Sequence, residues 1–396
     1  TGLVTVPTVS TWSLFGQIVI LILIQIGGLG IITVISGLMI SLHKKIGIGD
    51  RLLIQDAFNL NSLSGLVKFI KNVLLGTLIV EGVGALLYMT VFVPEYGAKG
   101  IWISIFNSIS AFCNAGIDII SEDSLCDYAT NPIINIVTCL LIILGGIGYI
   151  VWWDFIRVLK HIKQHSLKCF RYLTLHSKIA ICTTFFLILA GALCFLTFEY
   201  DNPLTLGGLS LADKLQVAFF QSVTTRTAGF ATVPQQHLTD ASVIVSLLLM
   251  FIGGSPVGTA GGVKTVTMAV LFFSAFATIR NQENVTLFDR TISKKAISKG
   301  VAVISVSFMI MFISSVLLSV VTPANAIDIL FETVSATATV GLTRNVTPLL
   351  NLWGKIIIII TMYLGRIGPI SLLIAFNTQK TNNDNIKNPV EEISVG

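Results

Sequence analysis

Charged side chains are scarce in this chain. Of its 396 residues only 11% are Asp, Glu, Lys or Arg and 54% are hydrophobic, whereas about a quarter of the residues in an average soluble domain are charged. This shortage, with a mean hydropathy of +0.86, excludes an ordinary soluble protein. Apolar runs long enough to cross about 30 Å of hydrocarbon predict an all-α, polytopic membrane protein with about seven crossings. The runs cover residues 12–41, 66–93, 132–156, 178–198, 241–279, 301–321 and 352–376.

Residues suited to catalysis or metal binding are also few. The five histidines lie near the ends of the apolar runs or in the links between them, and no cluster of His, Asp or Glu falls inside a run. The six cysteines are scattered and form neither a CxxC metal motif nor a disulfide framework. No glycine-rich phosphate loop joins a strand to a helix. The sequence therefore predicts no enzyme and no organic cofactor, and any nucleotide is expected to bind another chain.

The few charges are unevenly distributed. Lys and Arg gather around residues 44–51, 157–178 and 280–299, and links of this kind are retained on the cytoplasmic side of membranes. The links between them are acidic, as around Glu122 and Glu199, and are expected to face outside. The net charge of +5 thus reports topology, and we expect a lipid bilayer and no nucleic acid around this chain.

Four glycines recur at almost constant spacing. Gly2, Gly116, Gly229 and Gly341 are separated by 114, 113 and 112 residues. A second glycine cluster follows each of them, after 25, 29, 24 and 24 residues. Two landmarks repeated in this way indicate an internal fourfold repeat. We interpret the second clusters of the first two units as packing surfaces between helices rather than ion ligands. The second clusters begin at Gly27, Gly145, Gly253 and Gly365.

A short semi-polar segment precedes each of the last three repeated glycines. Segments 102–112, 211–223 and 326–336 are too short to cross a bilayer at about 1.5 Å per residue. They fit re-entrant helices that return as extended backbone, which survives at membrane depth only beside protein or water. Each unit is therefore predicted as two crossings flanking a pore helix (M1-P-M2). Four parallel units would surround a central pore, unlike the inverted repeats of many transporters.

The small tripeptides that end in these glycines are the predicted selectivity filter. A cation that leaves water needs replacement oxygens, and backbone carbonyls can supply them. Glycine lets the chain turn its carbonyls toward the axis, and the C-terminal ends of the pore helices also favour cations. We expect K⁺ at the filter carbonyls, and Na⁺ stays open as a second ion. The predicted filter residues are Thr1, Gly2, Asn114, Ala115, Gly116, Thr227, Ala228, Gly229, Thr339, Val340 and Gly341.

The third unit contains a further irregular stretch, GGSPVGTAGGVKT (253–265). Gly, Ser and Pro in quick succession disfavour a helix partway through the membrane. The stretch predicts a flexible intramembrane loop beneath the filter, with a kinked helix as the alternative. Lys264 directly follows the loop, where a positive flank on the cytoplasmic side is an equal alternative to a role in the loop.

Arg366 and Asp118 are the charged residues closest to these segments. Arg366 lies inside an apolar run and would cost several kcal/mol if it faced lipid, so it must face protein or water. Below the filter its charge would raise a barrier to cations, and loop carbonyls could pair with its guanidinium. The alternative is a snorkelling or structural arginine. Asp118 either concentrates cations at the mouth or caps the following turn.

In five motifs the chain resembles the Trk/Ktr/HKT superfamily of cation transporters, and within it the bacterial Ktr-type potassium-translocating subunit. The resemblance implies four M1-P-M2 repeats, single-glycine filter loops, a homodimer in the bacterial cytoplasmic membrane and a cytosolic RCK-type nucleotide-binding ring as partner. It also implies that the intramembrane loop is the gate. The motifs are SISAFCNAGIDI (108–119), QSVTTRTAGFATV (221–233), SATATVGLTRNVTP (335–348), GGSPVGTAGGVKT (253–265) and YLGRIGPISL (363–372). The gate residues are then Gly253, Gly254, Ser255, Pro256, Gly258, Thr259, Gly261, Gly262, Lys264 and Arg366.

Two features depart from the family pattern. The first outer helix and first pore helix are missing before Thr1, so the native protein is expected to be longer. Cys113 stands where family members often carry a polar amide, and both a space-filling role and exposure to the outer vestibule stay open.

The function that follows is potassium uptake through a single channel-like pore that is controlled in trans. A sodium-coupled or sodium-conducting secondary transporter is the alternative. The predicted units are a partial first repeat (1–55), repeat two (56–165), repeat three with the gate loop at 253–263 (166–290), repeat four (291–378) and a cytoplasmic tail (379–396).

Overall fold

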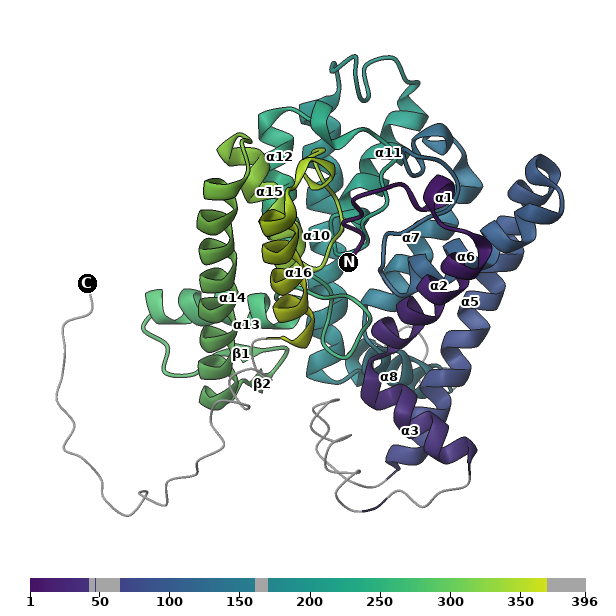
Figure 1. Cartoon of the computed structure of the whole chain (residues 1–396). Coiled ribbons are helices and arrows are strands. Elements are labelled where there is room, and N and C mark those ends of the chain that lie inside the picture. Colours follow the sequence, from purple (N-terminus) through teal and green to yellow (C-terminus); the bar gives the residue numbers. More distant parts are fainter. Residues whose placement is uncertain (43–46, 48–64, 161–169, 369–396) are drawn as a thin grey trace.

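The computed structural model describes residues 1–42, 47, 65–160 and 170–368. The predicted tail (379–396) and the basic residues around 44–51 lie outside these ranges. The described chain is predominantly helical, as predicted, with one small hairpin, β1–β2, that was not predicted (Figure 1). The helices are α1 (Thr8–Thr11), α2 (Leu14–Leu29), α3 (Ile31–Ser41), α5 (Leu66–Tyr96), α6 (Ala98–Phe112), α7 (Pro132–Gly146), α8 (Tyr149–Lys160), α10 (Leu175–Glu199), α11 (Leu211–Thr224), α12 (Asp240–Phe251), α13 (Thr265–Ile279), α14 (Lys294–Val321), α15 (Ala326–Ala338) and α16 (Leu352–Ile367), with strands β1 (Thr286–Leu287) and β2 (Arg290–Thr291).

Three of the described helices, α5, α10 and α14, are by themselves long and apolar enough to cross a membrane. The bent pairs α2–α3 and α7–α8 bring the total to five if each pair counts as one span. The pairs turn by 98° and 97°, so the runs 12–41 and 132–156, expected as single crossings, are broken. The bends occur at Gly30 (φ 84°) and Gly148 (φ 93°), a backbone conformation that glycine adopts without steric cost.

Two of the predicted crossings are represented by shorter helices. The run 241–279 forms α12 and α13, separated by the non-helical residues 252–264, so this stretch is a loop and not a kinked helix. The run 352–376 forms α16 up to Ile367, and the rest of it lies outside the described residues.

Each long helix packs against the short helix that follows it in the chain. The pairs are α5 with α6, α10 with α11, and α14 with α15. The short helices end a few residues from the boundaries expected for them. In α15 every residue from Phe331 to Ala338 is buried, whereas only 28% of the most apolar window of α14 is buried. The short helices therefore lie inside the molecule, and the long ones present apolar faces to the outside.

Local sequence explains where several helices begin. Asn131 accepts hydrogen bonds from the amides of Ile133 and Ile134 (3.1 and 3.2 Å), and Pro132 occupies the first turn of α7. A polar side chain at this position satisfies amides that the helix itself cannot pair, and proline needs no donor there. Similar side-chain caps start α10, α11, α12, α14 and α16 at Thr174, Ser210, Thr239, Ser293 and Asn351.

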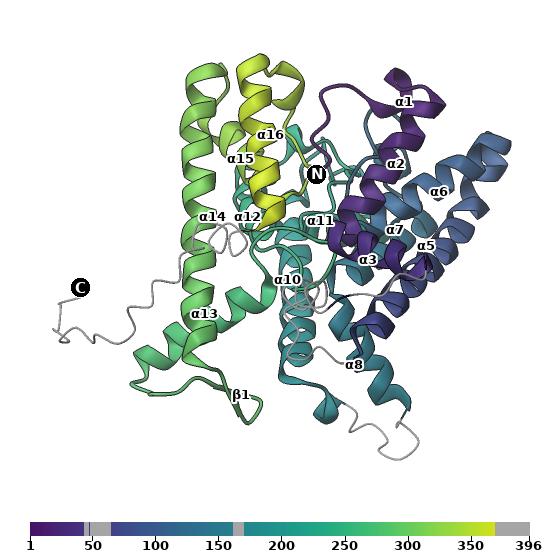
Figure 2. The same cartoon turned by 60° about the horizontal axis from the view of Figure 1, so that its bottom comes forward.

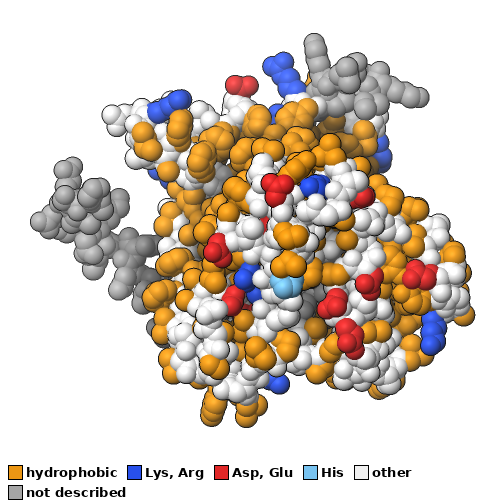
Figure 3. All heavy atoms as spheres, turned by 90° about the horizontal axis from the view of Figure 1, so that it is seen from above, with side chains coloured by type: hydrophobic (Ala, Val, Ile, Leu, Met, Phe, Trp, Pro, Cys, Tyr) orange, Lys and Arg blue, Asp and Glu red, His pale blue; other side chains and the backbone are white. Residues whose placement is uncertain are grey.

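The N-terminus lies in the interior of the molecule, between α16 and α2, in both Figure 1 and Figure 2. Seen from above, Asp and Glu side chains gather around the middle of one face, with Lys and Arg mostly nearer its margin (Figure 3). This face includes the link between α10 and α11. Its acidic character agrees with the charge pattern expected of the outer links.

Candidate functional site

The four repeated glycines contact one another in a closed cycle. A Cβ added to Gly2, Gly116, Gly229 or Gly341 would lie closer than 3.0 Å to backbone atoms of the next tripeptide. The order is from Gly2 to Gly116, then to Gly229, Gly341 and back to Gly2. Four segments far apart in sequence thus meet at one place, each by its backbone, and only glycine fits there.

Three of the tripeptides share the same backbone conformation. The residue two before the glycine has a positive φ, as does the glycine itself, while Gly2 is not among the positive-φ residues. Non-glycine residues seldom adopt this region, and its recurrence shows that the three tripeptides leave their short helices in the same way. The angles are 52° at Asn114 and 67° at Gly116, 72° at Thr227 and 90° at Gly229, and 56° at Thr339 and 104° at Gly341.

Hydroxyl groups in the last turns of the short helices brace these loops. Ser335 Oγ accepts from the Gly341 amide (3.0 Å) and Ser110 Oγ accepts from the Ile117 amide (3.1 Å). Thr224 Oγ1 donates to a carbonyl of the third loop (2.6 Å). These hydrogen bonds hold the loops in their conformation without a bound ligand. A preorganised site is expected to be built in this way.

The loop between α12 and α13 is closed at its base by backbone hydrogen bonds. The Gly253 amide donates to the Val263 carbonyl (2.9 Å), and the Thr265 amide donates to the Gly254 carbonyl (3.0 Å). Ser255 Oγ and Thr265 Oγ1 lie 2.9 Å apart. These bonds satisfy part of the backbone that the interrupted helix leaves free.

The same loop also bonds to the second unit. The amides of Ser255 and Thr259 donate to the carbonyls of Gly146 (2.8 Å) and Gly145 (3.0 Å). Thr259 Oγ1 donates to the Phe112 carbonyl at the end of α6 (2.9 Å). The glycine cluster at 145–146, interpreted as a packing surface, therefore packs closely and supplies carbonyl acceptors as well.

Glycines in the loop allow close approach to its surroundings. A Cβ on Gly261 would lie 2.9 Å from the Ala338 carbonyl oxygen, next to the fourth tripeptide, and one on Gly258 would lie 2.9 Å from the Gly145 carbonyl oxygen. Gly262 has a φ of 67°. The Pro256 carbonyl packs against Gly148. All ten predicted gate residues but Arg366 belong to this segment and its flank.

Arg366 reaches the loop from α16. Its Nη1 donates to the Thr259 carbonyl (2.6 Å), and its Nη2 donates to the carbonyls of Gly28 (3.1 Å) and Gly27. Lys264 Nζ donates to the Ala260 carbonyl (2.6 Å). Within the described ranges neither cation forms an ion pair. Two positive charges are thus held by backbone carbonyls of the loop and of α2.

Two buried charged residues beside the site were not singled out from the sequence. Arg226 directly precedes the third tripeptide and is 6% exposed, and Glu81 on α5 is 4% exposed. The Gln25 side-chain amide donates to Glu81 (3.1 Å), and the Cys113 thiol lies 3.8 Å from the same carboxyl. The one acidic residue in the apolar run 66–93 was a visible signal at Glu81, since such residues are costly in lipid.

Cys113 and Asp118 have defined surroundings, and those of Cys113 decide between its two alternatives. Cys113 is 4% exposed and packs against Gly28, so the vestibule-facing alternative is wrong and the space-filling one fits. Asp118 Oδ1 accepts from the Ile120 amide (3.4 Å), which is the capping arrangement. Burial raises the pKa of Asp118 to about 6, and hydrogen bonds, first from Ser124, oppose that rise.

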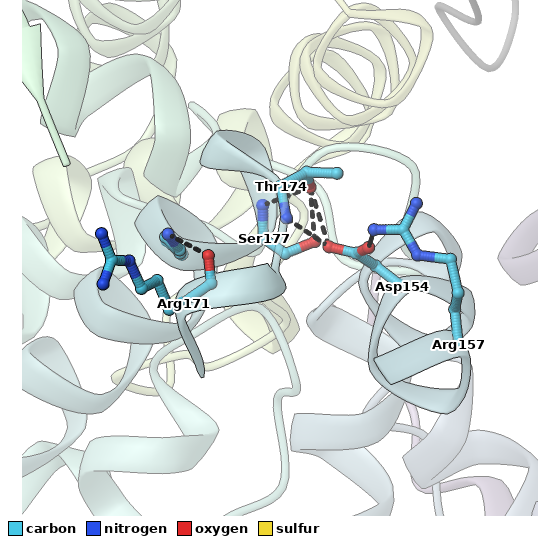
Figure 4. A network of polar contacts seen from close by, with 6 residues as sticks. Asp154, Arg157, Arg171, Thr174 and Ser177 are labelled. Atoms are coloured by element: carbon cyan, nitrogen blue, oxygen red, sulfur yellow. Dashed lines mark hydrogen bonds and ion pairs between the residues drawn. The ribbon is translucent and has the colours of Figure 1, made fainter. Parts of the chain in front are cut away.

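On the side of the molecule opposite the acidic face, a polar network joins α8 to the start of α10 (Figure 4). Asp154 accepts from the amide and the hydroxyl of Thr174 (2.8 and 2.9 Å) and pairs with Arg157. Lys178 donates to the Arg171 carbonyl (3.0 Å). The network holds α8 against the start of α10.

Residues 1–387 match the TrkH family, described as a cation transport protein. The chain is 38% identical over its full length to Ktr system potassium uptake protein B of Bacillus subtilis (strain 168), with 86% of that protein covered. It is 37% identical over its full length to the potassium/sodium uptake protein NtpJ of Enterococcus hirae, with 87% covered. The crystal structure of the potassium transporter TrkH from Vibrio parahaemolyticus shares the fold, with a TM-score of 0.69 at 15% identity over 95% of this chain and 76% of that one.

Proposed function

Because the chain belongs to the TrkH family of cation transport proteins, as its motifs predicted, we propose that it carries potassium into the cell through a single channel-like pore. Potassium uptake is in the name of the Bacillus relative, and the similarity extends over the whole chain. The Bacillus and Enterococcus relatives come from bacteria, which supports a multi-pass location in a bacterial cytoplasmic membrane.

The pore is formed by four M1-P-M2 units. Support for this arrangement comes from the sets of long helix, short helix, tripeptide and following helix in the second, third and fourth units. The units begin with α5, α10 and α14, and the partial first unit contributes Gly2, α2 and α3. The proposed boundaries are those expected from the sequence.

The glycine cycle is the observation that carries the proposal. In this arrangement the carbonyls of the four tripeptides replace the water around K⁺. Three short helices point their C-terminal ends at the tripeptides, where the partly negative end of a helix favours a cation. A shared positive φ before each of three glycines supports a common orientation of these carbonyls.

The loop at 253–263 is the proposed gate beneath this filter. It contacts the ends of α6 and α15, and its backbone hydrogen-bonds to the second unit and to Arg366 of the fourth. Arg366 and Lys264 place positive charge beside it. In the closed state this charge opposes the passage of a cation. Opening requires the hydrogen bond between the loop carbonyl and the Arg366 guanidinium to break.

Control by a second protein and a dimeric state complete the proposal. The Bacillus relative is named as protein B of a system, which supports a separate component. We propose a homodimer with a cytosolic RCK-type nucleotide-binding ring. The cytoplasmic links would receive that ring, since they carry most of the basic residues.

Sodium is the second candidate ion. The Enterococcus relative is named as a potassium/sodium uptake protein at nearly the same identity as the potassium relative. A sodium-coupled or sodium-conducting pathway would use the same glycine cycle. Tracer flux down a gradient of K⁺ alone, without Na⁺, distinguishes a channel-like pathway from obligatory coupling.

Growth of a potassium-uptake-deficient bacterium at low external K⁺ tests the proposal. The protein is expected to rescue growth, and Gly229→Ser and Gly341→Ser are expected to abolish rescue while membrane levels stay unchanged. Gly82→Ser is the matched control, because an added Cβ there meets nothing within 4 Å. Rescue that survives both filter substitutions would remove the filter assignment.

A further inference from the structure

Arg226 stands between the proposed filter and the proposed gate. It follows the last turn of α11, where its amide donates to the Val223 carbonyl (3.1 Å), and it directly precedes Thr227. Thr227 has a φ of 72° and Gly229 a φ of 90°. The backbone of Arg226 is therefore continuous with the third filter loop, and any rotation there moves this residue.

The side chain of Arg226 extends toward the gate loop. Its Nη2 lies 3.4 Å from the Gly253 carbonyl oxygen and 3.4 Å from Thr184 Oγ1 on α10. Gly254 and Gly146 line the same small pocket, with apolar residues of α7 and α10. Among the described residues Arg226 has no ion pair, and its buried Nε has no hydrogen-bond partner. A guanidinium with so few partners depends strongly on the carbonyl that it does reach.

Gly253 is the residue at which the loop begins. Its amide closes the base of the loop through Val263, so a group that holds its carbonyl holds the base. Arg366, by contrast, binds Thr259 in the middle of the loop and comes from the fourth unit. Besides the local contact of Lys264 with the Ala260 carbonyl, the loop thus has cationic contacts from Arg226 and Arg366 at different points along its length.

We infer that Arg226 is a positioning residue that fastens the base of the intramembrane loop to the third filter loop and couples ion occupancy of the filter to the gate. The inference rests on the proposed function. A K⁺ ion at the filter carbonyls restrains Thr227 and Gly229, and Arg226 passes that restraint to the Gly253 carbonyl. Loss of the guanidinium leaves the filter in place but releases the base of the loop.

Amide hydrogen exchange of the purified protein in lipid nanodiscs, in KCl or in choline chloride, tests this coupling. In the wild type, K⁺ is expected to slow exchange both in the filter segment 224–230 and in the loop segment 252–265. In Arg226→Gln the loop is expected to exchange about tenfold faster, as for the loss of one hydrogen bond to a charged group. K⁺ should still protect the filter segment in that variant but no longer the loop.

Lys214→Gln is the matched control. Lys214 is a buried cation on α11, the helix that precedes Arg226; it donates to the Tyr200 carbonyl (2.7 Å) and has no hydrogen bond to the loop. In Lys214→Gln, K⁺ should slow amide exchange of the loop segment 252–265 as it does in the wild type. Arg226→Lys keeps the positive charge on a single ammonium group, so the loop is expected to exchange at an intermediate rate. This variant tests the inference if Arg226→Gln fails to fold.

Equal K⁺ protection of the loop in the Arg226 variants and in Lys214→Gln would overturn the inference, as would absence of that protection in the wild type. Absence of K⁺ protection at the filter segment in every protein would instead count against the proposed function. The experiment therefore distinguishes failure of the inference from failure of the proposed function.

Discussion

Arg366 on α16 donates through Nη1 to the Thr259 carbonyl, 2.6 Å away, in the loop that interrupts the third unit. The two residues are 107 positions apart in the chain. The same guanidinium binds the carbonyls at the end of α2. One side chain thus joins α16, the loop between α12 and α13, and the end of α2.

Replacement of Arg366 by Gln is expected to raise basal K⁺ flux about tenfold. The change removes a positive charge from the pathway and hydrogen bonds worth roughly 1.5–3 kcal/mol each, and about 1.4 kcal/mol is a factor of ten. Tracer flux in proteoliposomes measures the effect. Lys355→Gln, on the same helix but near its start, is the control and should leave flux unchanged. Equal flux in both variants would contradict the barrier role.

Replacement of Thr259 by Val is expected to raise basal flux by a smaller factor, about three- to tenfold. The hydroxyl donates to the Phe112 carbonyl (2.9 Å), and a neutral hydrogen bond contributes roughly 0.5–1.5 kcal/mol. Loss of this bond weakens the closed loop without removing charge. Thr278→Val removes a hydroxyl that bonds only within α13 and should match the wild type. A reduced flux in Thr259→Val would argue against closure by this contact.

Replacement of Gly116 by Ala is expected to abolish uptake. Its φ of 67° disfavours a side chain by about 1–2 kcal/mol, and the added Cβ would overlap the backbone of the third tripeptide. Gly208→Ala is the comparison, since a Cβ there meets nothing within 4 Å. Rubidium uptake into cells at matched membrane levels reports the difference. Normal uptake by Gly116→Ala would show that the cycle tolerates widening and is no filter.

Uptake at low external K⁺ is expected to rise as external pH increases through about 6. Burial raises the pKa of Asp118 from 3.8 to about 6, so this carboxyl near the filter gains its negative charge in that range and then attracts cations. Because the folded-state pKa lies above the unfolded one, ionisation of Asp118 lowers folding stability as pH rises from about 4 to 6. Asp118→Asn should remove both effects.

Two measurements between about pH 5 and 7.5 test Asp118→Asn: the initial rate of uptake and the temperature of thermal unfolding. Both depend on pH where a group titrates. Glu122→Gln, in the same link, is the control. A pH profile of uptake that is unchanged by Asp118→Asn would assign the dependence to another group and leave Asp118 with its capping role alone.

Much of the helical arrangement could be predicted because its determinants are local. Apolar runs and caps mark the long helices, and the lengths of segments 211–223 and 326–336 mark the short ones. The interruption after Phe251 followed from Gly, Ser and Pro in succession. The bends at Gly30 and Gly148 were missed, because a glycine in an apolar run is compatible with a helix and with a bend, and packing decides between them.

The candidate site was only partly predictable for a related reason. The spacing of the four glycines identified the tripeptides, and one arginine in an apolar run identified Arg366. Glu81 and Arg226 were equally visible as charges, yet their partners Gln25 and Gly253 lie far away in sequence. Nothing local says which carbonyl or amide a buried charge will find.

By itself the sequence determined that this protein is helical, belongs in a membrane and repeats a glycine-ended tripeptide four times, because composition, hydrophobic length and spacing are properties of the chain alone. Only the tertiary structure decided that the four glycines close into a cycle, that the loop at 252–264 lies against the ends of α6 and α15, and that Arg226 and Arg366 hold it at two points. Those features depend on contacts between segments up to 339 residues apart, and such contacts are set by how helices pack.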